Sequence, residues 1–192
     1  MDRCIGLLWH AGRVPKVADP AVRVALIEAA ARITAEEGRD ALSLRRVAGE
    51  VGASTMAVYT HFGGMVELRR EVRREGFARL AASLATVEDT DDPVADTVAL
   101  GIAYYRMALA NPHLYRAMFL DGKVDEQDAG VGLETYQPLL RHVGRCIDAG
   151  RFSPAAPHDL AKQVWATLHG FVSLHIAGMI AALQGPDYRT AL

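Results

Sequence analysis

The stretch SLRRVAGEVGASTMAVYTHF, residues 43–62, decides the fold of this 192-residue chain. Its first half places apolar residues at the i, i+3, i+4 and i+7 spacing of one helical face: Leu44, Val47, Ala48 and Val51. Gly52 can adopt the left-handed conformation that ends a helix, and the Ser54 hydroxyl can cap the next helix by accepting a backbone N–H bond. The pattern therefore predicts two short helices joined by a tight turn.

The second helix of this pair should run from about Thr55 to His61. Val58 and Phe62, four residues apart, would pack it against the first helix. The other side chains on this helix are small or polar enough to approach a DNA duplex: Thr55, Met56, Ala57, Tyr59, Thr60 and His61. A generic helical hairpin, the competing interpretation, would require neither the glycine–serine spacing nor an exposed tyrosine and histidine. The sequence thus predicts a helix-turn-helix surface for a DNA groove.

These residues closely resemble the helix-turn-helix of the tetracycline-repressor (TetR) family. The matching positions are the helix-opening serine, a Val-Ala pair, the glycine turn and two pairs that contain aromatic residues: Ser43, Val47-Ala48, Val51-Gly52-Ala53-Ser54, Val58-Tyr59 and His61-Phe62. The resemblance implies that three residues face base edges: Thr55, Met56 and Ala57. It implies that four others hold phosphates, which position the domain but do not specify sequence: Ser43, Tyr59, Thr60 and His61.

Base recognition by Met56 and Ala57 would be limited to apolar contacts, such as one with a thymine methyl group. Sequence preference would then be modest, or would rest partly on Arg45 or Arg46. A departure from the family pattern lies at Met65, because the family usually carries a lysine three residues after the final aromatic. One phosphate contact per subunit would therefore be missing.

The charge distribution separates the two halves of the chain, whose overall formal net charge is −2. Residues 1–76 hold 12 Lys and Arg against 10 Asp and Glu, whereas residues 77–192 hold 9 against 13. This asymmetry favours the N-terminal part as the nucleic-acid side, although many proteins that bind no DNA differ as much. Cys4 and Cys146 are the only cysteines, so they offer no disulfide framework and suit a reducing cytoplasm.

Helical periodicity continues along the chain, so we predict an all-α protein in three parts. Residues 1–20 are expected to form an N-terminal extension, which is either flexible, or not native to the protein, or an arm that reaches a neighbouring DNA groove. Its apolar run is too short for the core of a signal peptide. Residues 21–81 form the DNA-binding domain and residues 82–192 a helical ligand-binding and dimerisation domain. A loop is expected at 121–130, and helices are expected at about 21–37, 65–87, 94–110, 112–119, 131–149 and 158–183.

The last of these helices carries no formal charge over residues 164–183, which is long enough to span a membrane. Its pattern predicts a helix buried in protein instead, because one stripe holds small residues: Ala166, Gly170, Ser173, Ala177 and Ala181. His169 and His175 would also be costly in lipid. We therefore predict no membrane span.

The resemblance extends into this helix, because Trp165, His169 and Gly170 are similar to the Trp-His-Gly signature of one class of TetR ligand-binding domains. Tyr105 and the segments 111–115 and 118–119 resemble the same class, so the likeness covers about residues 21–185. It implies a pocket for an unknown small, largely apolar ligand, whose binding shifts the two DNA-binding domains of a homodimer on a palindromic operator. Candidate lining residues, each of which could equally fill a helical core, are Met107, Tyr115, Met118, Phe119, Trp165, His169 and Val172.

His169 could bond the ligand or a buried carbonyl. The family's dimer is usually a four-helix bundle of the last two helices, yet this chain ends at Leu192, soon after residues 185–187 would begin the second. Dimerisation would then depend on the 158–183 helix, alone or with the 131–149 helix.

His142 and Cys146, four residues apart, could share a metal ion, but two ligands do not make a site, so no metal or cofactor is predicted. The chain has no G-x-G-x-x-G, no H-E-x-x-H and no complete nucleophile elbow, so we do not expect an enzyme. The leading prediction is a DNA-binding transcriptional regulator released by its ligand. The rival is an all-α small-molecule-binding module that has lost specific DNA binding, as Met65 and the short C-terminus would suggest.

Overall fold

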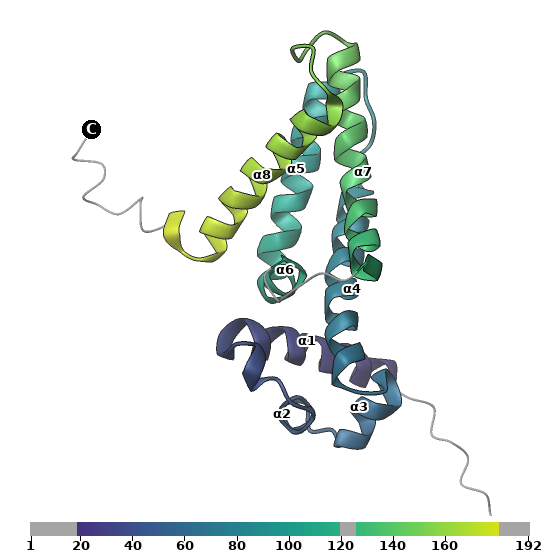
Figure 1. Ribbon diagram of the computed structural model, residues 1–192, viewed down its shortest axis with the longest axis vertical. Helices are drawn as coiled ribbons and strands as arrows, with labels where there is room; N and C mark the ends of the chain where they lie inside the picture. The colour runs from purple at the N-terminus through teal and green to yellow at the C-terminus, as the bar shows by residue number, and fades with distance from the viewer. Residues whose placement is uncertain (1–18, 120–125, 181–192) are drawn as a thin grey trace, which may run out of the picture.

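The computed structural model describes residues 19–119 and 126–180. Within these ranges the chain forms helices and no strand, so the predicted all-α class is confirmed (Figure 1). The helices are α1 (Pro20–Glu37), α2 (Leu44–Glu50), α3 (Thr55–Phe62), α4 (Met65–Leu84), α5 (Pro93–Ala110), α6 (Pro112–Phe119), α7 (Glu126–Asp148) and α8 (Pro157–Ile176), with a short 3-10 helix at Arg39–Ala41.

The first three helices gather at one end of the molecule, and α4 rises from them into a body that it shares with α5, α7 and α8 (Figure 1). The Asp19 carboxylate caps α1 by accepting from the Ala21 N–H, and Gly38, at φ 89°, ends that helix. The core beneath the turn contains apolar residues from α1 to α4, including Leu26, Val47 and Val58.

Helix α4 belongs to two hydrophobic cores. Leu68 and Val72 pack in the core of the helix-turn-helix end, whereas Phe77, Leu80 and Leu84 pack in the core of the body. The domain boundary expected after residue 81 therefore lies inside one continuous helix. A rigid α4 links the two ends of the molecule.

Helix α6 also contributes to both cores, although it is only eight residues long. Leu114 and Ala117 join the helix-turn-helix core, and Tyr115 and Met118 join the body core. Its approach to α4 is close at Gly76, where an added Cβ would lie 2.5 Å from Met118 Cγ. A side chain at this position would force the two helices or Met118 to move.

Three element boundaries differ from the sequence-based expectation. The loop expected at 121–130 is wrong for its second half, because α7 begins at Glu126. Helix α8 ends at Ile176 instead of 183, because Gly178 takes a left-handed conformation with φ 76°. Helix α4 ends at Leu84, three residues before the expected end.

Across residues 19–119 and 126–180, no helix is long and apolar enough to cross a membrane. The turn at Gly178 interrupts the uncharged stretch that raised this question. Other expectations fall outside the described residues: the extension ahead of Asp19, the segment at 185–187 and the chain end at Leu192.

Candidate functional site

The turn between α2 and α3 has the caps that the sequence predicts. The Ser43 hydroxyl accepts from the Arg46 N–H at 3.3 Å, and the Ser54 hydroxyl accepts from the Ala57 N–H at 3.3 Å. Gly52 between them has φ 67°, in the left-handed region that favours glycine. These local bonds fix the angle at which α3 leaves the turn and therefore which of its side chains face solvent.

Helix α3 exposes both polar and apolar side chains to solvent. Val58 and Phe62 are buried against the core, as expected, while Met56 is 68% exposed and Tyr59 50% exposed. Thr55 and Thr60 are also exposed, and the two remaining α3 candidates for DNA contact, Ala57 and His61, are half-buried.

The Thr60 hydroxyl donates to the Met56 carbonyl at 2.9 Å. A hydroxyl has only one proton, so this side chain must rotate before it can donate to a phosphate. Thr60 is therefore a weaker phosphate donor than Tyr59, whose phenol is half exposed.

The two arginines of α2 differ in their surroundings. Arg46 forms ion pairs with Glu50 and, at 2.8 Å, with Glu37. The hydrogen bond that Arg46 donates to the Glu50 carboxylate is the main cause that raises the Arg46 pKa above its ordinary value. Arg45 is exposed, so of the two it is better placed to reach DNA. Both line a shallow groove along α2 with Ser43, Gly49 and Glu50.

Met65, at the position where a lysine was expected from the family resemblance, opens α4 after Gly64. Its side chain is half-buried and packs against the helix-turn-helix core. The residue therefore contributes to packing at the base of α4, and a thioether cannot replace a lysine as a phosphate donor.

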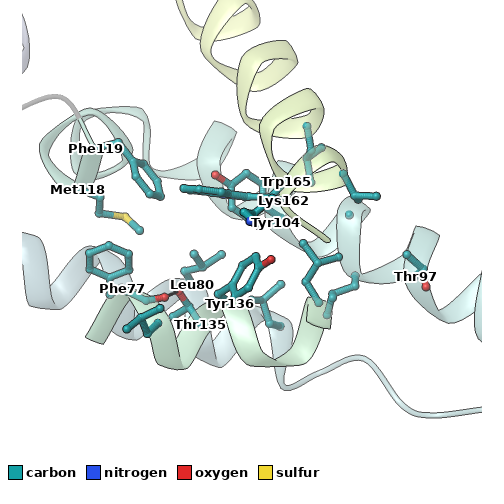
Figure 2. Close-up of a pocket in the computed structure, with 18 of the residues that line it drawn as sticks. Phe77, Leu80, Thr97, Tyr104, Met118, Phe119, Thr135, Tyr136, Lys162 and Trp165 are labelled. Carbon is teal, nitrogen blue, oxygen red and sulfur yellow. Dashed lines mark hydrogen bonds between the residues drawn. The ribbon is translucent and has the colours of Figure 1, made fainter. Parts of the chain in front are cut away.

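A cavity of about 590 Å³ lies in the body between α4, α5, α6, α7 and α8. Figure 2 shows Phe77, Met118 and Phe119 gathered at one end, with Thr97 at the other and Trp165 and Tyr136 between. Most lining groups are apolar, and the polar ones are Thr97, Tyr104, Thr135, Tyr136, His158 and Lys162.

Of the seven residues predicted for the ligand pocket, Met118, Phe119 and Trp165 line this cavity. The other four are absent from its wall, and Met107, Tyr115 and Val172 are buried in the surrounding core. His169 lies behind the wall and is hydrogen-bonded to Tyr104, which lines the cavity.

The sequence did not identify the lining residues of α7 or the N-terminal part of α8. Leu133, Tyr136 and Leu139 in α7 face the cavity. The sequence of α7 predicts a helix, but it does not indicate which neighbouring helices or cavity the apolar face of α7 contacts. Lys162 and His158 also lie on the wall, and both precede the stretch that drew attention in the sequence.

A network of three polar side chains joins α5, α6 and α8 behind this wall. His169 Nδ1 lies 2.7 Å from the Tyr115 hydroxyl and 3.1 Å from the Tyr104 hydroxyl, and the two hydroxyls are 3.1 Å apart. Burial lowers the pKa of His169, so the imidazole is neutral near pH 7. Burial also raises the pKa of the Tyr104 and Tyr115 phenols, which remain protonated. Because Tyr104 lines the cavity, a ligand there would contact this network directly.

Polar contacts also tie α6 to α1. Arg116 of α6 donates to the Ala35 carbonyl at 3.3 Å. Arg79 of α4 donates to Asn111 Oδ1 at 2.6 Å, at the start of α6, and forms an ion pair with Glu28 of α1. Helix α6 therefore contacts the cavity on one side and the helix-turn-helix end on the other.

Two family models match these two ends of the chain. The model described as "Bacterial regulatory proteins, tetR family" matches residues 26–72, and the model described as "Tetracyclin repressor-like, C-terminal domain" matches residues 97–191. This chain belongs to the TetR family of transcriptional regulators. The TetR model of the N-terminal part contains the whole of α2 and α3, and the C-terminal model contains α6, α7 and α8.

Individual TetR-type relatives support the same assignment. The chain is 41% identical over 68 residues to the HTH-type transcriptional repressor DrrR1 of Streptomyces coeruleorubidus, a match that covers 34% of this chain and 25% of DrrR1. It is 24% identical over 149 residues to the HTH-type transcriptional regulator YobS of Bacillus subtilis, covering 78% and 76% of the two chains. The crystal structure of the TetR family regulator PfmR from Thermus thermophilus has the same fold, with a TM-score of 0.70 and 21% identity over 77% of this chain and 84% of PfmR.

Proposed function

We propose that this TetR-family chain is a transcriptional repressor that binds a palindromic operator as a homodimer and leaves it when a small, largely apolar ligand enters the body cavity. The observation that carries the proposal is the position of α6, which shares Tyr115 and Met118 with the body core and Leu114 and Ala117 with the helix-turn-helix core. Because the proposed operator lies on the chromosome, we infer that the protein acts in the cytoplasm. We take residues 21–81 as the DNA-binding domain and residues 82–192 as the ligand-binding and dimerisation domain.

The proposed DNA contacts follow from the exposed face of α3. Thr55, Met56 and Ala57 would meet base edges, and Ser43, Tyr59, Thr60 and His61 would hold phosphates. The proposal is supported by the exposure of five of these residues and the partial exposure of Ala57 and His61. Of the two arginines of α2, Arg45 is better placed to contact a phosphate, because Arg46 is paired with Glu37 and Glu50. The net result is one arginine and several hydroxyl donors per subunit for the phosphate backbone.

The proposed ligand follows from the cavity. A volume of about 590 Å³ falls in the range of small-molecule sites, and its aromatic wall favours an apolar body. Met118, Phe119 and Trp165 would contact the ligand directly, and His169 would respond through Tyr104. Displacement of Met118 or Phe119 would move α6, and the Arg116–Ala35 contact would pass that movement to α1.

The proposed dimer uses α8 and its surroundings. Phe171 is 47% exposed and Leu174 48% exposed, so α8 leaves two large apolar side chains partly in water. Pairing of this face with the same face of a second copy would remove both from water and place two copies of α3 on one side of the dimer. Such a dimer can match successive major grooves about 34 Å apart.

The decisive experiment is selection of a preferred duplex from a random library, followed by fluorescence anisotropy with the selected and a scrambled duplex at two salt concentrations. We expect specific binding that weakens as salt rises. Tyr59→Ala should weaken it about tenfold, the loss of one good phosphate contact. Val24→Ala, a change to a 49%-exposed apolar residue of α1, is the matched control and should bind as the unaltered protein does.

The second candidate function is a ligand-binding module without specific DNA binding, favoured by the half-buried thioether of Met65 in place of a phosphate-binding lysine. Failure of the library to yield any preferred duplex would support it. In that case we still expect a fluorescent apolar dye to bind in the cavity. Gly101→Leu should prevent dye binding, because it adds a large side chain to the part of the cavity wall that α5 forms. At Gly101 an added Cβ meets only Leu168 Cδ2, at 3.8 Å, so the variant can fold.

A further inference from the structure

Three side chains with metal-binding atoms converge in the body of the molecule. Asp89 lies in the connection after α4, Asp96 in the first turns of α5, and His142 in α7. One ligand atom from each lies within 4.8 Å of the others. Asp96 is 3% exposed and His142 is fully buried, whereas Asp89 is about half exposed. Asp96 and His142 are therefore held in place by burial, and the cluster is open to solvent on the side of Asp89.

The proton on the His142 ring can be assigned from its surroundings. Nδ1 lies 2.7 Å from the Pro138 carbonyl, which can only accept, so Nδ1 carries the proton and donates it. In the neutral ring Nε2 then bears a lone pair. Metal-binding histidines are commonly held in this way, with the second ring nitrogen donating to a carbonyl or carboxylate.

The His142 Nε2 atom is buried and has no hydrogen-bond partner. Asp89 Oδ1 is only 3.2 Å away, but it lies outside the direction in which a proton on Nε2 would point, so no hydrogen bond joins them. A buried lone pair beside a carboxylate oxygen is electrostatically unfavourable. A cation that contacts both atoms from the side would remove the repulsion.

We propose that Asp89, Asp96 and His142 bind a divalent transition-metal ion such as Zn²⁺. Two ligands of a tetrahedral ion with bonds of about 2.0 Å stand about 3.3 Å apart, close to the 3.2 Å between His142 Nε2 and Asp89 Oδ1. An imidazole with two carboxylates suits Zn²⁺ and its neighbours in the first transition row, and water would complete the coordination. Cys146, four residues from His142, donates to the Pro93 carbonyl at 3.2 Å and takes no part.

Arg145 is the internal competitor for this metal. Its Nη1 lies 2.7 Å from Asp96 Oδ2 and 3.2 Å from Asp89 Oδ1, and Arg141 lies 3.4 Å from the same Asp89 oxygen. These guanidinium groups neutralise the carboxylates when no metal is bound. Arg145 is 29% exposed and Arg141 59% exposed, so both can swing towards solvent as an ion enters. The metal and Arg145 should therefore bind the carboxylates in competition.

The test titrates the untagged full chain, freed of metal with a chelator, with Co²⁺ and then displaces Co²⁺ with Zn²⁺. We expect one ion per chain, with the visible absorption of low-symmetry Co²⁺ and a rise in the melting temperature. Asp89→Asn should weaken binding about tenfold or more, and it should fold because Asp89 is half exposed. His113→Ala, a half-exposed histidine of α6, is the control and should bind as before.

Arg145→Gln separates a true site from weak surface binding, because removal of the competing cation should tighten Co²⁺ binding. A merely structural role of Arg145 predicts the opposite or no change. The proposal is overturned if the unaltered chain and Asp89→Asn bind Co²⁺ alike, if Arg145→Gln binds more weakly while its circular dichroism stays native, or if no visible Co²⁺ band develops.

Discussion

His169 Nδ1 in α8 lies 2.7 Å from the Tyr115 hydroxyl in α6, which connects the helix of the Trp-His-Gly signature to the helix that touches both cores. Tyr104 of α5 lies 3.1 Å from each of them. The signature histidine therefore does not reach the cavity itself. It holds a tyrosine that does, and any shift of the cavity wall must change this contact.

Removal of the Tyr115 hydroxyl should cost stability without disturbing the fold. Tyr115→Phe keeps the ring contact with Phe119 but leaves His169 with the longer bond to Tyr104 alone. We expect a loss of about 1 kcal/mol in the free energy of unfolding, measured with urea. Tyr105→Phe removes a comparable 3.0 Å bond to His175, but Tyr105 is only half-buried whereas Tyr115 is buried, so this change should cost less. Equal costs would contradict a special role for the buried network.

The neutral state of His169 should make stability depend on pH. Because burial lowers its pKa in the folded protein, the unfolded chain binds the proton more readily. The stabilising effect of a neutral ring is present above pH ~6.5 and declines as the pH falls below that value. We expect urea midpoints of the unaltered protein to fall more steeply between pH ~7 and ~5.5 than those of His169→Gln. Parallel curves would show that His169 is not the group responsible.

Gly76 should be intolerant of a side chain. In Gly76→Ala the new Cβ would lie 2.5 Å from Met118 Cγ, and Met118 is only 1% exposed, so it cannot turn away freely. We expect a loss of about 1–3 kcal/mol in the free energy of unfolding. Gly144→Ala in α7 is the control, because nothing lies within 4 Å of its added Cβ. That change should be neutral or stabilising by up to about 1 kcal/mol, and the same loss at both sites would exclude packing as the cause.

Arg45 and Arg46 should contribute unequally to DNA affinity. Arg45→Ala removes an exposed cation, so binding to the selected duplex should weaken about tenfold and the salt dependence should become shallower by about one phosphate contact. Arg46→Ala should have a smaller effect on binding, because Glu37 and Glu50 already neutralise this guanidinium. Anisotropy over a salt series measures both quantities, and a larger effect of Arg46→Ala would reverse the assignment.

Leu174 should lie in the dimer interface that we propose. Leu174→Asp introduces a charge on a side chain that is 48% exposed in one chain, so it should leave the fold intact and convert dimers to monomers in sedimentation velocity. Val24→Asp changes an equally exposed residue of α1 and should leave the dimer unchanged. Dimers that persist in Leu174→Asp would place the interface elsewhere.

The sequence by itself determined the helix-turn-helix and the all-α class. The caps at Ser43 and Ser54 and the turn at Gly52 depend on neighbours within a few residues, and the four-residue spacing of Val58 and Phe62 marks the buried face of α3, so a linear pattern contains the information. The length of α8 was overestimated because an apolar stretch does not reveal that a glycine such as Gly178 will adopt a left-handed conformation.

Only the tertiary structure decided which residues line the cavity, that Arg46 is engaged by Glu37 of another helix, and that His142 faces Asp89 and Asp96. His142 and Asp89 are distant in sequence, and helix periodicity states which face is apolar but not which helix that face will meet. Sites made by several helices depend on crossing angles and on close approaches such as that of Gly76 to Met118. Those are set by the packing of the whole chain, whereas the DNA-binding motif is set by short-range hydrogen bonds and side-chain spacing.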